Sequence, residues 1–361
     1  MFGLFKKKKT ESGTVKIPKG FYEVTVSQVE KLTPNSVQVS FEIPKELTNE
    51  FYFVPGQYIN ICTEIDGAEE RRSYSICSGP GEVLSIAAKE VENGKVSKWM
   101  NNQLAAGDKV YISAPMGNFI LEDPSRKIIA FAAGSGITPV LSIAKSIAKS
   151  EGQLKLFYGN RNRESIMFGE ELKELKNTEV VNYLSADTAE GCFSGRLDKE
   201  AILSIFKSDL SNLRADGYYL CGPEAMVEAA TEVLNMFGVG KQKIHFELYT
   251  TPVAMEPVTE TNSSASFSGT SQVKVILDDE EIEFELEAGG RTILDAANKE
   301  GLDAPYSCRG GVCCTCRAKV LEGKAVMKLN YSLTDDEIEK GYILTCQATP
   351  VSEKIVVSYD A

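Results

Sequence analysis

The chain has 361 residues, of which 43% are hydrophobic and 25% are charged, a composition typical of a globular protein with room for two or three packed domains. Its formal net charge of −12 argues against non-specific binding to nucleic acid, so we expect no DNA or RNA partner. Nine cysteines are present without a secretory signal, which favours reduced thiols and a cytoplasmic location. The longest uncharged stretch, residues 128–144, is interrupted by glycine and proline, and we expect no membrane span.

Short alternating segments separated by turn residues predict an antiparallel β-barrel over residues 18–123. The expected strands are residues 22–26, 36–43, 58–62 and 109–113. Residues 1–17 combine a short apolar start with the lysine run Lys6–Lys9, and we expect a flexible basic tail there.

From residue 124 the pattern changes to apolar strands that alternate with helices, which predicts an α/β domain with a mostly parallel sheet over residues 124–250. The expected strands are residues 127–132, 154–158, 179–184 and 217–221. The expected helices are residues 139–149, 164–175 and 223–236.

Residues 251–272 are rich in Pro, Ser and Thr and have no apolar periodicity, so they predict a flexible linker. A third domain follows over residues 273–361. Its first elements are a hairpin formed by residues 273–277 and 281–286 and a helix over residues 292–299.

Four cysteines of the third domain have the spacing of an iron–sulfur site. Cys308, Cys313 and Cys316 follow the pattern C-x4-C-x2-C, and Cys346 supplies a fourth thiol, which is the plant-type arrangement around a 2Fe–2S cluster. Zinc is the competing metal, but zinc sites usually use paired C-x2-C units or histidines, and the one histidine, His245, lies far upstream. The spacing therefore favours the cluster.

Two strand-to-helix turns in the α/β domain indicate a nucleotide site. Gly134 and Gly136 permit close approach of the backbone to a pyrophosphate, and Pro139 suits the first turn of the helix that follows. The turn Cys221-Gly222-Pro223 ends another strand at the carboxyl edge of the sheet, where ligands of such sheets bind. Each turn taken alone is also compatible with an ordinary tight turn.

The barrel segment contains a second set of binding residues. Residues 71–75, Arg-Arg-Ser-Tyr-Ser, supply a cation for a phosphate, an aromatic ring for stacking and hydroxyls for hydrogen bonds. Downstream, residues 94–97, Gly-Lys-Val-Ser, predict a glycine turn at the start of a helix, which is a second phosphate cradle.

Taken in chain order, these motifs resemble the ferredoxin–NADP reductase superfamily over residues 18–361, with a plant-type ferredoxin domain of β-grasp fold at the C-terminus. The resemblance implies FAD in the barrel, a nicotinamide coenzyme in the α/β domain and a 2Fe–2S cluster in the third domain. The flavin residues that it implies are Arg72, Ser73, Tyr74, Ser75, Gly94, Lys95, Val96, Ser97 and Tyr249. The implied nicotinamide residues are Gly134, Gly136, Thr138, Pro139, Arg161, Cys221, Gly222 and Pro223. The implied catalytic residues are Ser75, Cys221 and Glu247.

Within the superfamily the domain order is most similar to the reductases of multicomponent oxygenases, such as that of phenylacetyl-CoA epoxidase. The resemblance implies that a hydride passes from NAD(P)H to FAD, that single electrons then reach the cluster, and that an external protein, an oxygenase component, accepts them. Two other functions stay open at this point. One is a reductase of a soluble ferredoxin or haem protein, and the other is a redox sensor without turnover.

The coenzyme and the acceptor surface are less defined. Arg161 follows the second strand of the α/β domain, where no acid is present to bind a ribose 2′-OH, which slightly favours NADPH. Ala186 lacks the charge expected of an NADP site, although Arg196 offers a substitute. The third domain has 10 Lys and Arg against 17 Asp and Glu, and the acidic runs 278–281 and 335–339 are candidates for steering a basic partner. Cys314, between two ligands, is expected only to fill space.

Overall fold

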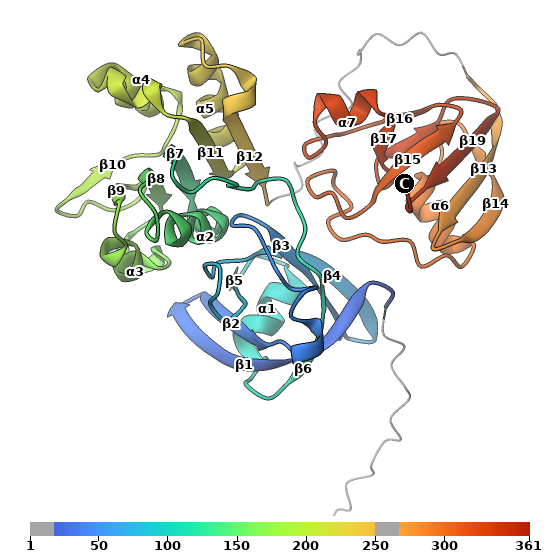
Figure 1. Ribbon diagram of the computed structural model, residues 1–361, viewed down its shortest axis with the longest axis horizontal. Coiled ribbons are helices and arrows are strands. Elements are labelled where there is room, and N and C mark those ends of the chain that lie inside the picture. Colours follow the sequence, from blue (N-terminus) through green and yellow to red (C-terminus); the bar gives the residue numbers. More distant parts are fainter. Residues whose placement is uncertain (1–17, 250–266) are drawn as a thin grey trace, which may run out of the picture.

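The computed structural model describes residues 18–249 and 267–361, which form three lobes (Figure 1). The first lobe is a β-barrel, the second an α/β domain and the third a smaller mixed domain, in the predicted chain order. The predicted basic tail over residues 1–17 and the predicted linker up to residue 266 lie outside the described residues.

The barrel is a six-stranded antiparallel sheet in the order β4-β3-β6-β1-β2-β5. Its strands are β1 (Phe21–Thr33), β2 (Ser36–Glu42), β3 (Tyr58–Ile65), β4 (Ala68–Ser75), β5 (Ser85–Lys89) and β6 (Lys109–Ser113). A single bridge between Ile76 and Ile86 joins the two ends of the sheet and closes it. A short 3-10 helix, η1 (Lys45–Leu47), follows β2, and helix α1 (Lys95–Asn102) follows β5.

The α/β domain is a parallel sheet in the order β10-β9-β8-β7-β11-β12. Its strands are β7 (Lys127–Ala133), β8 (Gln153–Asn160), β9 (Thr178–Leu184), β10 (Cys192–Ser194), β11 (Gly217–Gly222) and β12 (Ile244–Leu248). Its α-helices are α2 (Ile137–Ile147), α3 (Gly169–Glu174), α4 (Lys199–Ser208) and α5 (Glu224–Met236). Its 3-10 helices are η2 (Gly134–Gly136), η3 (Arg163–Ser165), η4 (Leu210–Arg214) and η5 (Lys241–Lys243).

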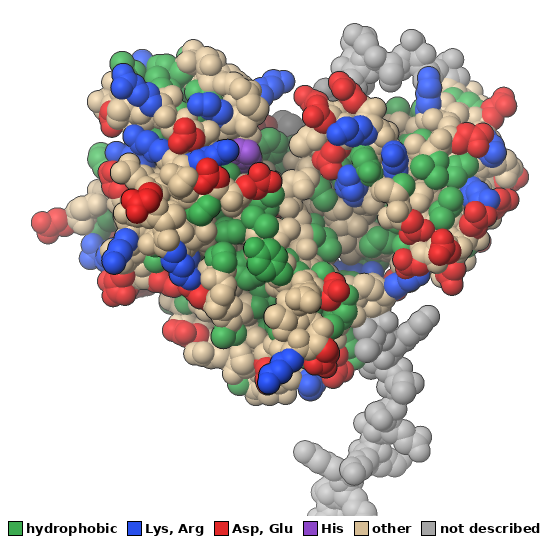
Figure 2. Space-filling model, viewed as in Figure 1, with side chains coloured by type: hydrophobic (Ala, Val, Ile, Leu, Met, Phe, Trp, Pro, Cys, Tyr) green, Lys and Arg blue, Asp and Glu red, His purple; other side chains and the backbone are tan. Residues whose placement is uncertain are grey.

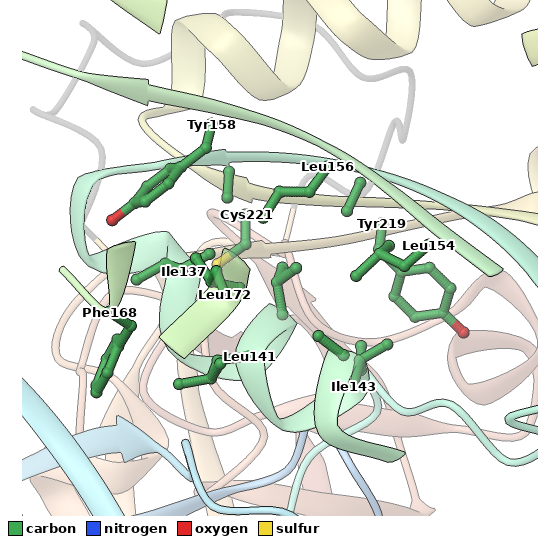
Figure 3. Packing of buried hydrophobic residues seen from close by; sticks show 14 of the residues in the cluster. Ile137, Leu141, Ile143, Leu154, Leu156, Tyr158, Phe168, Leu172, Tyr219 and Cys221 are labelled. Carbon is green, nitrogen blue, oxygen red and sulfur yellow. The ribbon is translucent and has the colours of Figure 1, made fainter. Parts of the chain in front are cut away.

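Alternating residues of the central strand β7 enter two hydrophobic cores. Ile128 packs with residues of α2 and α3, which cover one face of the sheet, and Figure 3 shows part of this cluster. Its neighbour Ile129 packs with residues of α4 and α5 on the other face. Burial on both faces explains why this strand is apolar without alternation.

One predicted helix differs from the structure. The segment 164–175 is not continuous, because η3 is followed by an irregular stretch before α3 begins at Gly169. A capping box at Asn162 closes the 3-10 turn onto Ser165, and Phe168 takes a left-handed conformation with φ 59°. Three separate local conformations thus replace the long helix that the apolar spacing predicted.

The third domain contains a five-stranded sheet in the order β14-β13-β19-β15-β17 and a small two-stranded sheet of β16 and β18. The strands are β13 (Thr270–Leu277), β14 (Glu280–Glu287), β15 (Arg317–Glu322), β16 (Ala325–Met327), β17 (Tyr342–Leu344), β18 (Ala348–Pro350) and β19 (Lys354–Ser358), and the helices are α6 (Ile293–Lys299) and α7 (Asp335–Glu339). The predicted hairpin is confirmed, and Asp278 and Asp279 form its turn with positive φ. Strand β13 begins at Thr270, so the last residues assigned to the linker are part of the sheet.

Charged side chains of both signs cover the surface, and acidic ones gather on the outer side of the third domain (Figure 2). The edge strand β14 carries the exposed residues Glu281, Glu283 and Glu285. The second acidic run, 335–339, forms helix α7, where Thr334 and Glu337 make a capping box and acidic residues fill the first turn. Within residues 18–249 and 267–361, no helix is both long and apolar enough to cross a bilayer.

Candidate cofactor sites

The four predicted cluster ligands come together as two pairs. Cys308 and Cys313 lie on the loop between α6 and β15, with their sulfurs 3.1 Å apart. Cys316 at the end of this loop lies beside Cys346, which follows β17, and the proximity of the two thiols raises the pKa of Cys316. In the described part of the chain, no three or more metal-ligating side chains gather around one point. Two thiol pairs suit two irons, each of which needs two thiolates, better than one zinc ion.

The backbone of this loop is shaped to stabilise thiolates. The Cys313 thiol and the backbone N–H groups of Gly310 and Val312 donate to the Cys308 sulfur and lower the pKa of Cys308 to about 6. Gly311 has φ 74°, and a Cβ there would lie 3.0 Å from the carbonyl oxygen of Leu329, so the tight turn needs glycine. These contacts fit an iron–sulfur cluster, whose sulfurs accept backbone hydrogen bonds.

Cys314 points away from the two thiol pairs. Its sulfur donates to the carbonyl oxygen of Ser332, and the amide of Asn118 in the barrel donates to it at 3.8 Å. Burial raises the pKa of the Cys314 thiol to about 11, so it is a protonated thiol at neutral pH. This position agrees with the space-filling role expected of Cys314 and adds a contact with the barrel.

The predicted flavin residues lie on β4 and at the start of α1. Glu70 forms ion pairs with Arg72 at 3.2 Å and with Lys95 at 2.7 Å, so both cations lie beside the N-terminus of α1. Gly94 precedes this helix without a side-chain cap, which leaves first-turn N–H groups for a phosphate. The side chain of Val96 is buried in the barrel core, so its backbone alone can serve the site.

The side chains of three other predicted flavin residues make contacts within the barrel or with the cluster domain. The hydroxyl of Ser97 donates to the Gly94 carbonyl and accepts from the backbone N–H of Val91, which lies just before the glycine turn. The ring of Tyr74 packs against the barrel core. Ser73 donates to Asn60 and is 2.8 Å from the hydroxyl of Ser307, so it faces the cluster domain.

Residues from three separate segments meet in one hydrogen-bonded chain. The Tyr249 hydroxyl donates to the Ser75 hydroxyl at 2.7 Å, and Ser75 donates to the Glu247 carboxylate at 2.9 Å. Thr138 at the start of α2 is 3.0 Å from the Tyr249 hydroxyl. The end of the flavin strand is thereby joined to the nucleotide turn and to β12. All four are predicted site residues from distant parts of the chain, and the structure brings them together.

These hydrogen-bonded side chains are buried, and their burial determines the protonation state of Glu247. Burial raises the pKa of Glu247 to about 7, against the opposing effect of hydrogen bonds from Ser75 and Tyr249. Cys221 lies beside Glu247 in the pairing of β11 with β12, and burial raises the pKa of its thiol well above the ordinary value. The Cys221 side chain points into the hydrophobic core that includes Ile137 (Figure 3). Cys221 is therefore a neutral thiol and not a nucleophile.

The two predicted nucleotide turns pack directly on each other. Strand β7 ends just before Gly134 and β11 ends at Gly222, next to Cys221. The strand order reverses between these neighbouring strands, which is the place where such sheets bind nucleotides. A Cβ on Gly136 would lie 2.0 Å from the carbonyl oxygen of Cys221, so only glycine fits. Gly134 has φ 54°, and η2 runs into α2 with Pro139 in its first turn, as predicted.

A cleft of about 590 Å³ opens at this edge of the sheet. It is lined by predicted residues, namely Gly134, Arg161, Gly222, Pro223 and Tyr249, and by Arg196. Its volume and its glycine turn fit a dinucleotide. It also contains Asn160, whose buried amide has no hydrogen-bond partner among the described residues, as expected of a group that awaits a ligand.

Sequence reasoning missed one cation of this cleft. Lys89 ends β5 of the barrel and lines the cleft, with its ammonium 3.8 Å from the position of a Cβ on Gly134. Burial lowers its pKa. A single lysine at the end of a strand carries no motif, so only the packing of the barrel on the α/β domain shows that it faces a phosphate site.

The cluster loop also contacts the barrel directly, which no motif indicated. Thr315, between Cys314 and Cys316, lies 3.2 Å from the Tyr58 hydroxyl and accepts from the Asn60 amide at 3.3 Å. The loop thus touches β3, the neighbour of the strand β4 that carries the predicted flavin residues. The cluster domain also reaches the α/β domain, because Val312 of the loop and Tyr331 pack against the core that contains α4 and α5.

Comparisons with known proteins agree with this arrangement. Three family models match: an oxidoreductase FAD-binding domain over residues 23–120, an oxidoreductase NAD-binding domain over 131–232 and a 2Fe–2S iron–sulfur cluster binding domain over 275–351. A component of 1,2-phenylacetyl-CoA epoxidase from Escherichia coli K12 is 37% identical over 94% of this chain and 98% of its own length. The ferredoxin reductase component of 3-ketosteroid-9-alpha-monooxygenase from Rhodococcus rhodochrous is 30% identical over 96% and 99%.

Among solved structures, phthalate dioxygenase reductase has the same fold, with a TM-score of 0.58 and 23% identity over 94% of this chain and 98% of that one. FAD, NAD and 2Fe–2S domains are thus all present in one polypeptide, and the predicted fold class, cofactors and enzyme class are confirmed. The chain belongs to the ferredoxin–NADP reductase superfamily, and it is an NAD(P)H-dependent oxidoreductase of the kind that serves as the reductase component of multicomponent oxygenases.

Proposed function

We propose that this chain is the reductase of a multicomponent oxygenase of the phenylacetyl-CoA epoxidase type and that NADPH is its electron donor. The observation that supports the acceptor is the 37% identity to a component of 1,2-phenylacetyl-CoA epoxidase across nearly the whole of both chains. The pool of NAD(P)H and the reduced thiols favour the cytoplasm as its location.

Each cofactor has residues suited to hold it. Arg72, Lys95 and the N-terminus of α1 would bind the FAD pyrophosphate, and the Gly134 turn with Lys89 and Asn160 would bind the nicotinamide dinucleotide. The cysteine pairs would bind the cluster. When bound, the flavin accepts a hydride and releases single electrons, which links a two-electron donor to a one-electron cluster.

The protein's contribution at the hydride end is orientation and exclusion of water. The Ser75 hydroxyl is fixed because it accepts from Tyr249 and donates to Glu247, so its position is set by two partners. Ser75 and the neutral Cys221 thiol are both buried, which keeps bulk water away from this network. A protein accelerates hydride transfer mainly by such orientation of the reacting groups and by exclusion of water.

The preference for NADPH is supported by charge in the cleft. Arg161 and Arg196 both line it, and the one acid among its described lining residues, Asp198, already caps helix α4 through the N–H of Ala201. A ribose 2′-phosphate would find two cations there, whereas a 2′-OH would find no free carboxylate among these lining residues to accept its hydrogen bond.

Reconstitution tests the proposed acceptor. The holoprotein, NADPH and the oxygenase subunits of a phenylacetyl-CoA epoxidase are combined, and epoxide formation from phenylacetyl-CoA is measured against the same mixture without this chain. We expect product only in the complete mixture. Rapid reduction of a soluble ferredoxin or haem protein with no product from the oxygenase would contradict the proposal.

A further inference from the structure

Two adjacent arginines of strand β4 lie in opposite environments. Arg72, in the predicted flavin motif, has 51% of its side chain exposed, whereas Arg71 has 3% exposed. Neighbouring residues of a strand point to opposite faces, so only one of the two can face the flavin site. Arg71 begins the segment 71–75 but is not among the flavin residues that the resemblance implies, and its buried charge needs an explanation.

The guanidinium of Arg71 connects two domains. Its Nε donates to Glu69 of the same strand at 2.7 Å, and its Nη2 donates to Asp303 of the cluster domain at 2.9 Å. It also stacks over the ring of Tyr306 at 4.6 Å, again in the cluster domain. Its charge is therefore compensated by both domains together.

Asp303 and Tyr306 lie just before the first cluster ligand, Cys308, in the segment that leads from α6 into the cysteine loop. Asp303 is held a second time by the barrel, because it accepts from the backbone N–H of Lys19 at 3.2 Å. A shift of this segment would move the loop relative to β4.

The cluster domain has other contacts with the rest of the chain, including an ion pair of Lys19 with Asp278, which lies on an exposed hairpin turn and not beside the cysteine loop. Ser73 with Ser307 and Tyr58 with Thr315 are pairs of neutral hydroxyls. Contacts with the α/β domain include a hydrogen bond from the Tyr331 hydroxyl to Glu224 at 3.2 Å and apolar packing of Val312 and Tyr331. Charge-assisted bonds to a buried guanidinium are the stronger and more directional kind.

We propose that Arg71 is a positioning residue that holds the cluster loop against the flavin strand through Asp303 and Tyr306, and so sets the rate of electron transfer from FAD to the cluster. The proposal rests on the proposed path from FAD to the 2Fe–2S cluster. In this path single electrons would pass from the reduced flavin to the cluster, two for each hydride received. The proton left on the flavin by the hydride would go to solvent, and the cluster would give the first electron to the external acceptor before it takes the second. Because electron transfer slows steeply with distance, a loosened loop slows this step alone.

Three variants test the proposal in the full-length holoprotein. Asp303→Asn removes the charge from the cluster domain at a half-exposed position and leaves β4 unchanged, so it tests docking without disturbing the flavin strand. Arg71→Lys keeps the charge but cannot bridge Glu69 and Asp303 with two fixed donors. Lys109→Gln is the control, because Lys109 pairs with Glu23 on the exposed surface of the barrel alone.

Three quantities are measured on each variant. After anaerobic mixing with NADPH, flavin bleaching reports hydride transfer and the freeze-quenched EPR signal of the reduced cluster reports the second step. We expect Asp303→Asn and Arg71→Lys to slow the second step about tenfold or more with flavin bleaching unchanged, because the bond that ties the buried guanidinium to the cluster domain is weakened. Small-angle scattering of the same proteins without coenzyme should show a larger radius of gyration for both variants and none of these changes for Lys109→Gln.

Wild-type rates and radius in both variants would overturn the proposal, as would an equal loss in flavin bleaching, which would place the effect in the flavin strand. If wild-type protein passes no electrons to the cluster, the proposed path itself fails. Even then the scattering comparison decides whether Arg71 and Asp303 hold the domains together.

Discussion

The hydride end and the cluster end of this molecule are stabilised by different means. At the hydride end, Ser75, Glu247 and Tyr249 come from distant segments and are joined by side-chain hydrogen bonds in a buried place. At the cluster end, the thiol pair Cys308 and Cys313 is shaped by one loop and by its own backbone N–H groups. The hydride end therefore depends on tertiary packing and contains a titratable carboxyl, while the cluster end depends on sulfur ligands and on domain docking.

The largest expected effect is at the cluster end. Cys313→Ser removes one of two thiolates from an iron, so we expect loss or a clear shift of the cluster's visible absorption and of electron transfer beyond the flavin. Cys314→Ser is the matched control from the same loop, because that sulfur points to Ser332 and not to a thiol pair. Absorption spectra after anaerobic reconstitution compare the two, and equal bleaching in both would refute the ligand assignment.

At the hydride end, Ser75→Ala removes the hydroxyl that connects Tyr249 with Glu247. We expect flavin reduction by NADPH to slow about 100-fold, since loss of positioning at a reacting centre has effects of that size. Stopped-flow absorbance measures the rate, and the cluster's EPR signal after dithionite reduction should match wild type. An unchanged rate of flavin reduction would show that the network is structural only.

The coenzyme preference is a smaller effect within the same end. Arg161→Ala and Arg196→Ala should each raise KM for NADPH about tenfold and leave KM for NADH unchanged. Both arginines are proposed to bind the ribose 2′-phosphate, and NADH has no such group. Arg126→Ala is the control, because Arg126 precedes β7 at the opposite end of the sheet. A wild-type enzyme that uses NADH far better than NADPH would remove the basis of the proposal.

The last expected effect concerns the stability of the fold and not electron transfer, and it is a dependence of stability on pH. Glu247 has a pKa of about 7 in the folded protein, above that of an exposed glutamate, so the folded state binds the extra proton and is favoured by it. This contribution is present at low pH and is lost as pH rises through about 7. Between about pH 5.5 and about pH 8 it amounts to about 2 kcal/mol. Urea unfolding of apoprotein should show this loss in wild type and not in Glu247→Gln, and parallel curves would contradict the burial of an ionisable carboxyl.

The difference between the two ends also explains what the sequence could predict. The cluster ligands Cys308, Cys313 and Cys316 are close together in the sequence, and so are the residues of the Gly134 turn. Both sites could therefore be predicted from the sequence. Lys89, Asn160 and Arg71 have no local signature, and their roles follow only from the packing of one domain on another.

Similarly, the apolar spacing of residues 164–175 predicted one helix, but the cap at Asn162 and the left-handed Phe168 divide it. The resemblance supplied Glu247 and Tyr249, which spacing alone would not have joined to Ser75. Side-chain positions that depend on contacts between domains could not be predicted from the sequence.

The most direct test of the account is the order in which the two coloured centres of one polypeptide are reduced. Anaerobic holoprotein is mixed with NADPH, and flavin absorbance and the cluster's EPR signal are followed in the same time course. The account predicts that the flavin bleaches first, that the cluster signal follows, and that Cys313→Ser retains the first step and loses the second. Reduction of the cluster without prior bleaching of the flavin, or a reconstituted protein with no acid-labile sulfide, would contradict it.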